Sequence, residues 1–279
     1  MRALGLDWSG GAAARAKIWA AVVEDEALVE LSRPFAALDL VRVHGAAGLA
    51  VASPAPRAVA DAFAPWLAAQ RFDVAGFDFC FALAAGQSAR LALPGGPAAA
   101  GALLAARFGD DALAFREAAG REQRRKTDAL RGAPFAPTNL RMFRQTFWGL
   151  RALAAVRDPM APWSDGPRRV HEVLPRLRAT ALCGRCRYKD PASRAGRERL
   201  LSALRPGLRI GAAHEALLLD DGEGDAIDAV LAALEVRDAR TSRETAPPEA
   251  LRTGEGWIYS SAELRKRFRT DPAAVASSQ

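Results

Sequence analysis

The chain has 279 residues, half of them hydrophobic and a quarter charged, which is enough apolar material for one large domain or two small ones. No apolar run reaches the about 18 residues that a membrane-spanning helix needs, and no basic segment followed by an apolar one opens the chain. We therefore expect a cytoplasmic protein with no membrane partner. The odd number of cysteines, three, argues against a disulfide scaffold.

The net charge of +7 and the pI near 10.0 favour an anionic partner such as nucleic acid, either RNA or DNA. Only four of the 39 basic residues are lysines, a ratio typical of a GC-rich coding genome, so the charge supports this partner only weakly.

The first part of the chain is predicted to form four strands and one helix. Residues 3–7, 17–23 and 27–32 are apolar runs in close succession, and small flexible residues link the first two. A helix is predicted from about 56 to 69, where apolar residues fall at helical spacing, and a buried strand follows at 72–78.

The remainder of the chain contains a long interruption before the pattern resumes. Residues 85–165 are polar and basic, with glycine and proline clusters between helical segments, and we expect an insertion of helices and loops there. The later predicted elements are a strand at 169–174, helices near 192–204 and 225–236, an extended segment at 255–259 and a frayed tail at 270–279.

Four aspartates occupy the ends of these predicted elements. Asp7 and Asp78 each close a strand, and Asp225 and Asp228 open the helix that begins at residue 225. Residues three apart on a helix share a face, so Asp225 and Asp228 could reach one cation together. Clustered carboxylates repel one another and lose hydration energy, so a cluster of all four would need a cation such as Mg²⁺ or Mn²⁺.

Each aspartate also has a plainer interpretation. Asp225 could cap the helix, with Asp228 as an acidic first-turn residue. Asp7 could simply begin a turn, and Asp78 could accept hydrogen bonds from backbone amides.

Seven short segments, in order along nearly the whole chain, resemble an uncharacterised family of predicted RNase H-like nucleases. They are Gly5–Gly10, Gly76–Phe81, Arg125–Asp128, Glu172–Pro175, Tyr188–Lys189, Asp225–Ala229 and Glu255–Tyr259. The sixth segment, with Asp225 and Asp228 three residues apart, also resembles the closing acidic helix of RuvC-type resolvases. The resemblance implies a metal-dependent phosphodiesterase fold.

The fold expected from the element order and the resemblance is a single α/β domain over residues 1–279. Its RNase H-like mixed sheet has three meandering strands, then parallel strands with helices, and residues 85–165 form the insertion between the fourth and fifth strands. In that topology the ends of the first and fourth strands lie side by side and the last helix packs near them. The four aspartates would then converge.

The function expected from this arrangement is metal-dependent hydrolysis of nucleic-acid phosphodiester bonds. Asp7 would bridge two metal ions roughly 4 Å apart, with Asp78 and either Asp225 or Asp228 completing their ligands. Glu172 is a further candidate catalytic residue, as a ligand or a support, although a paired structural glutamate is an equal alternative.

Three basic residues, Arg125, Lys126 and Lys189, are candidate contacts for substrate phosphates. A solvated basic helix end is the alternative for the first two. The alternative functions are an actin-like ATP-dependent phosphotransferase and a catalytically silent nucleic-acid-binding protein.

Overall fold

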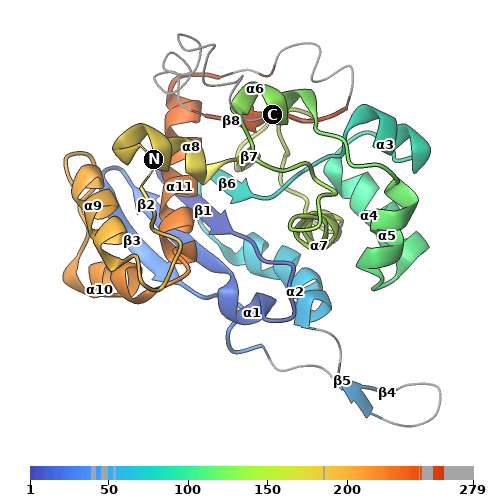
Figure 1. Ribbon diagram of the computed structural model, residues 1–279, viewed down its shortest axis with the longest axis horizontal. Helices are drawn as coiled ribbons and strands as arrows, with labels where there is room; N and C mark the ends of the chain where they lie inside the picture. Colours follow the sequence, from blue (N-terminus) through green and yellow to red (C-terminus); the bar gives the residue numbers. More distant parts are fainter. Residues whose placement is uncertain are drawn as a thin grey trace.

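A six-stranded mixed sheet lies at the centre of the protein (Figure 1), whose computed structural model describes residues 1–38, 42–44, 50–52, 55–184, 186–244, 246 and 254–260. The strands, in their order across the sheet, are β3 (Ala27–Ser32), β2 (Trp19–Glu24), β1 (Arg2–Asp7), β6 (Val74–Asp78), β7 (Arg169–Val173) and β8 (Ile258–Tyr259). The pairs β1–β2 and β2–β3 are antiparallel, whereas β1–β6, β6–β7 and β7–β8 are parallel. The chain is therefore a mixed α/β protein.

The strands match the sequence predictions, with shifts at their ends. The largest shifts have local causes. The predicted strand at 17–23 starts later because a short helix, α1 (Ala14–Lys17), precedes β2, and only Ile258–Tyr259 of the extended segment pairs as a strand. A separate pair, β4 (Arg42–His44) and β5 (Ala50–Ala52), was not predicted. The expected frayed tail at 270–279 lies outside the described residues.

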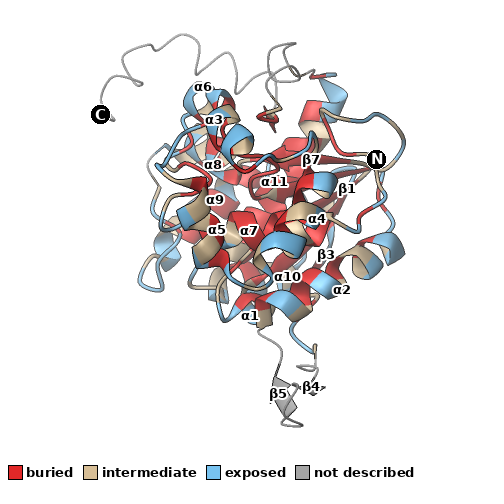
Figure 2. Ribbon diagram, turned by 90° about the vertical axis from the view of Figure 1, so that its right-hand side faces the viewer, coloured by how far each residue is buried: buried red, intermediate tan, exposed pale blue. Residues whose placement is uncertain are grey.

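Helices cover both faces of the sheet. On one face lies α11 (Asp225–Thr241), flanked by α8 (Pro175–Cys183), α9 (Arg194–Leu204) and α10 (Ala212–Asp220). On the other face lie α2 (Ala55–Ala69) and α7 (Phe143–Leu153). Buried residues accordingly concentrate in the sheet, α11 and α7 (Figure 2). Within the described residues, no helix has both the length and the apolar character required to cross a bilayer.

The stretch at 85–165 contains the helices predicted for it. They are α3 (Ala85–Arg90), α4 (Pro97–Phe108), α5 (Ala112–Ala119), α6 (Lys126–Arg131) and α7, and all five lie between β6 and β7 in the chain. The last of them, α7, returns to the sheet and packs against α2 and α4.

Side chains along β1 and β6 alternate between the two faces, as the pleat of a strand requires. Leu4 and Leu6 of β1 join the core under α2 and α7, whereas Ala3 joins the core under α11. By the same alternation, Asp7 and Asp78, at the ends of β1 and β6, lie on the α11 side of the sheet.

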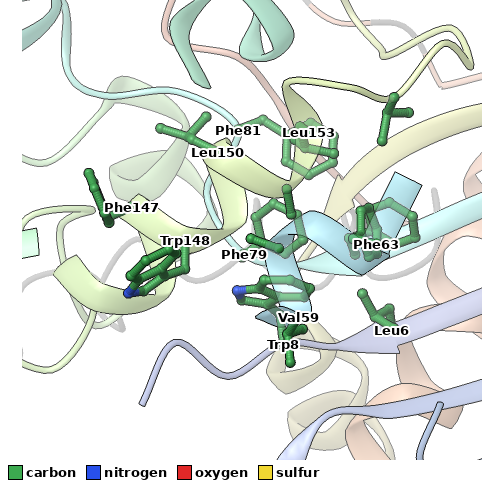
Figure 3. Close-up of a cluster of buried hydrophobic side chains, with 14 of the residues drawn as sticks. Leu6, Trp8, Val59, Phe63, Phe79, Phe81, Phe147, Trp148, Leu150 and Leu153 are labelled. Carbon is green, nitrogen blue, oxygen red and sulfur yellow. The ribbon is translucent and has the colours of Figure 1, made fainter. Parts of the chain in front are cut away.

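An aromatic cluster fixes these two strand ends from the opposite face (Figure 3). Trp8 and Phe79, each the residue directly after one of the aspartates, have ring centroids 5.4 Å apart. The Trp8 ring also meets Phe63 of α2 at 5.3 Å, and Phe79 meets Phe81 at 5.2 Å. Buried aromatic pairs of this kind hold the backbone on either side of them.

Two glycines let α11 lie unusually close to the sheet. A Cβ atom at Gly5 of β1 would lie 2.0 Å from the carbonyl oxygen of Ala229, and one at Gly76 of β6 would lie 2.7 Å from that of Ala232. Both separations are too short for a carbon atom, so the helix backbone rests where these side chains would be. Since Gly5 and Gly76 are paired across the strands, α11 crosses β1 and β6 at one level, two residues before the aspartates.

We predict that Gly5→Ala lowers the free energy of unfolding by more than about 1–3 kcal/mol, the usual cost of overpacking a core, because the added methyl group meets helix backbone. Gly11→Ala is the matched control, since a Cβ there has only Ser9 Oγ nearby, at 3.8 Å, and it should change stability by less than about 0.5 kcal/mol. Urea unfolding measures the free energy of unfolding of both variants. If Gly5→Ala is as stable as Gly11→Ala, the close approach of α11 to β1 is contradicted.

Candidate metal centre

Three aspartates from three elements meet at one end of the sheet. Asp7 and Asp78 are partners in the parallel register of β1 and β6, so their side chains start from neighbouring positions. Asp228 comes from the first turn of α11, which crosses the same two strands. One carboxylate oxygen from each of the three lies within 4.8 Å of the others. We refer to Asp7, Asp78 and Asp228 as the aspartate triad.

Two members of the triad have no hydrogen-bond donor. Within the described part of the chain, no group donates to the carboxylate of Asp7 or of Asp78, although Asp7 is only 6% exposed. Burial raises the pKa of Asp7 well above its usual range and the pKa of Asp78 to about 8; the Lys189 ammonium opposes this shift, and the neighbouring aspartates add to it. Buried carboxylates are normally paired, hydrogen-bonded or bound to a metal, so this pair lacks the compensation that burial demands.

Asp228, the third member, is held by two neighbours. The Tyr188 hydroxyl donates to its Oδ1 atom at 2.7 Å, and the Lys189 ammonium forms an ion pair with its Oδ2 atom. Burial lowers the pKa of Lys189, but Asp228 and then Asp7 outweigh it, so the net pKa is well above its usual range. The ammonium is therefore charged and belongs to the site.

Asp225 lies beside the triad rather than in it. It lines the same pocket, and its Oδ1 atom is 3.7 Å from the Lys189 ammonium. Burial raises its pKa to about 6. Asp225 does not cap α11: the cap position is Gly224, in the left-handed conformation, and the side chain of Asp221 accepts from the Ala226 amide at 2.7 Å. The capping alternative for Asp225 is thus wrong.

The triad suits a hard divalent cation. It offers only carboxylate oxygens, which Mg²⁺ and Mn²⁺ prefer, and no thiolate or imidazole of the kind that favours zinc. The two carboxylates without donors would gain the counter-charge that they lack. Asp225 is near enough to contribute a further oxygen at the same pocket.

The triad opens into a pocket of about 1170 Å³ that is also lined by basic residues. Four exposed arginines line it, and none is paired with a carboxylate in the described part of the chain. We call these residues the arginine rim: Arg141, just before α7, Arg144 of α7, Arg176 of α8, and Arg187. A pocket with an acidic floor and unpaired guanidinium groups above it fits an anion that approaches a bound cation.

Two of the predicted site residues neutralise each other. Arg125 is only 1% exposed, and its guanidinium donates to Glu172 Oε2 at 2.8 Å and to Asp128 Oδ1 at 2.7 Å. Glu172 also accepts from the Phe81 amide at 2.9 Å. Arg125 lines the pocket, but its guanidinium is engaged by two carboxylates, so these contacts do not favour its expected role as a phosphate contact. For Glu172, the paired structural alternative is the one that the contacts favour.

Lys126, another predicted phosphate contact, lies outside the pocket. Lys126 is exposed at the start of α6, its amide donates to Glu255 at 2.8 Å, and it is not among the residues that line the pocket. Gly10, three residues after Asp7, packs on α7, where a Cβ would lie 2.3 Å from the carbonyl oxygen of Arg144.

Gln145 is a site residue that the sequence did not reveal. Its Nε2 group donates to the carbonyl oxygens of Trp8 and Asp78, each at 2.8 Å. One side chain of α7 therefore ties together the ends of β1 and β6, at the positions that carry Asp7 and Asp78. Its partners are backbone atoms, which have no signature in the sequence, so only the helical spacing of α7 against the sheet could have suggested it.

Comparisons with protein-family models, with curated proteins and with solved structures found no match to this chain. The case for a function therefore rests on the geometry of the triad, the arginine rim and the pocket between them.

We predict that the metal-free protein loses stability as the pH rises from about 4 to about 8. The unfolded chain releases the Asp78 proton near pH 4, whereas the folded protein retains it up to about pH 8, so folding binds protons across this range. Each carboxylate with a raised pKa lowers the free energy of unfolding by at most ~1.4 kcal/mol per pH unit in this range. Urea unfolding in EDTA should give a flatter profile for Asp78→Asn, and identical profiles would contradict the raised pKa.

We also predict that Gln145→Leu lowers the free energy of unfolding by about 1–3 kcal/mol, because two part-buried hydrogen bonds to the strand ends are lost. It should also weaken binding of Mn²⁺ to the triad. Gln70→Leu is the control, since Gln70 donates only to the Trp66 carbonyl one turn earlier. If both variants unfold and bind Mn²⁺ alike, Gln145 does not hold the strand ends.

Proposed function

We propose that this protein is a Mg²⁺- or Mn²⁺-dependent nuclease with an RNase H-like fold. The single observation that carries the proposal is the pair of donor-free carboxylates, Asp7 and Asp78, on adjacent strand ends and within reach of Asp228. Such a group of like charges is unfavourable unless a cation joins it.

The order of the elements supports the fold part of the proposal. Three antiparallel strands come first, parallel strands follow on the other side of β1, and α11 lies across β1 and β6 with its first turn at their carboxyl ends. This order of elements supports the RNase H-like topology that the resemblance implies.

The aspartate triad and the arginine rim would have different roles in the reaction. The triad would hold the ion, and Asp225 offers an oxygen for a second one, as a two-metal mechanism requires. A divalent ion in such a site supplies a hydroxide at neutral pH and stabilises charge on the leaving oxygen. The arginine rim would bind phosphates on either side of the scissile bond and so orient the strand over the triad.

A second candidate function has one specific observation in its favour. The Lys189 ammonium already lies against Asp228 and near Asp225, so part of the acidic charge is neutralised without a metal. A catalytically silent nucleic-acid-binding protein would use the arginine rim alone. Its binding would weaken with salt but would not depend on a divalent ion.

We predict metal-dependent cleavage of at least one of three polymers: RNA, DNA or an RNA–DNA hybrid. Asp7→Asn should reduce the rate by at least roughly 100-fold, since removing one electrostatic stabiliser from a catalytic site commonly costs that much. Asp61→Asn, an exposed position on α2, is the matched control and should retain full activity.

Equal cleavage by the wild type and Asp7→Asn would overturn the proposal. Binding that persists in EDTA without any cleavage would instead support the silent binding protein. ATP hydrolysis in place of nucleic-acid cleavage would support the phosphotransferase alternative.

A further inference from the structure

Lys189 occupies the side of the triad where a cation would be expected. Its ammonium pairs with Asp228 Oδ2 and lies 3.7 Å from Asp225 Oδ1. Yet 45% of its side chain is exposed, whereas the Asp228 side chain is 3% exposed. A half-solvated cation thus reaches down to a buried carboxylate.

Asp228 has both of its oxygens engaged. Oδ1 accepts from Tyr188 and Oδ2 from Lys189. A carboxylate oxygen has a second lone pair, but a divalent ion placed on Oδ2 would lie within a few ångströms of the ammonium and be repelled by it. Of the two donors, Lys189 is the one that can leave at low cost, because Tyr188 is only 7% exposed.

The backbone that carries Lys189 is firmly held. The buried guanidinium of Arg197 donates to the carbonyl oxygen of Asp190 at 2.8 Å and to that of Tyr188 at 3.2 Å. On the other side, Gly224 lies so close that a Cβ there would be 2.9 Å from the Tyr188 ring. Movement of the ammonium is therefore confined to the flexible side chain, while the segment stays beside the triad.

Asp7 gives an independent reason to expect an ion at this place. Its carboxylate is more than nine-tenths buried, lines the pocket, and has neither a hydrogen bond nor an ion pair within the described residues. Lys189 pairs with Asp228, but within the described residues it forms no hydrogen bond or ion pair with Asp7 or Asp78. The lysine is thus an incomplete substitute for a divalent ion.

We infer that Lys189 is a tethered cation, which holds Asp228 before a divalent ion binds and must withdraw its ammonium for the triad to take that ion. This inference rests on the proposed metal site. After withdrawal the side chain remains at the pocket, because its backbone is fixed, and its charge then faces the phosphate of a bound strand. Lys189 therefore competes with the metal and assists the substrate.

The test is Mn²⁺ titration by calorimetry with three lysine variants. Lys189→Met should tighten Mn²⁺ binding at least about tenfold, since two like charges a few ångströms apart repel by more than the thermal energy even in water. Lys189→Arg keeps the charge and should stay within about threefold of the wild type, by the same argument. Lys17→Met is the matched control, because that ammonium pairs with Glu223, outside the triad, and its effect should be below about threefold.

A second measurement observes the withdrawal itself and needs no variant. The chain has four lysines, Lys17, Lys126, Lys189 and Lys266, so reductive methylation followed by mass spectrometry resolves each one. Methylation of Lys189 should accelerate when Mn²⁺ is added, whereas that of Lys17 should not change. This methylation measurement tests the withdrawal of Lys189 even if Lys189→Met fails to fold.

The outcomes separate the inference from the proposed function. If the wild type and Asp7→Asn bind Mn²⁺ equally or not at all, the proposed metal site fails. If Asp7→Asn loses binding but Lys189→Met binds no more tightly than the wild type, or if Mn²⁺ leaves Lys189 methylation unchanged, the metal site stands and the tethered cation is overturned.

Discussion

The close approach of α11 to the sheet is the constraint on which the rest of the structure depends. Without side chains at Gly5 and Gly76, the helix backbone comes down onto β1 and β6, and small residues on its buried face permit this. The first turn of α11 then lies beside the carboxyl ends of both strands. A larger residue at either glycine would raise the helix and carry Asp228 away from Asp7 and Asp78.

The charged groups around the pocket differ in how far they are buried and in whether they have partners. At the floor, Asp7 is buried and Asp78 is partly buried, and within the described residues neither carboxylate accepts a hydrogen bond, so the pKa values of both are raised. To one side, the carboxylate of Glu172 is fully engaged by Arg125 and the Phe81 amide, and it adds no open ligand. At the edge of the pocket, the four arginines of the rim have no carboxylate partner within the described residues. The pocket thus brings carboxylates without donors and arginines without ion pairs close to one another.

The sequence was sufficient to predict the strand ends and insufficient for the contacts between distant side chains. Asp7 and Asp78 each close an apolar run, so their places could be deduced from the pattern of the strands. The choice between Asp225 and Asp228 could not, because it depends on how α11 is rotated over the sheet. The pairing of Arg125 with Glu172 could not be predicted either, since the two residues lie 47 positions apart and burial of an arginine leaves no local signal.

Helix α7 contributes both to the arginine rim and to the position of the strand ends that carry Asp7 and Asp78. It supplies Gln145, which ties the two strand ends, while the preceding residue, Arg144, belongs to the rim, and the backbone of Arg144 lies close to Gly10. A protein engineer who replaced the 85–165 segment to alter what the pocket accepts would therefore also remove the brace beneath the acidic residues. Specificity in this architecture cannot be exchanged as an independent module; any graft would have to bring its own amide to the same two carbonyl groups.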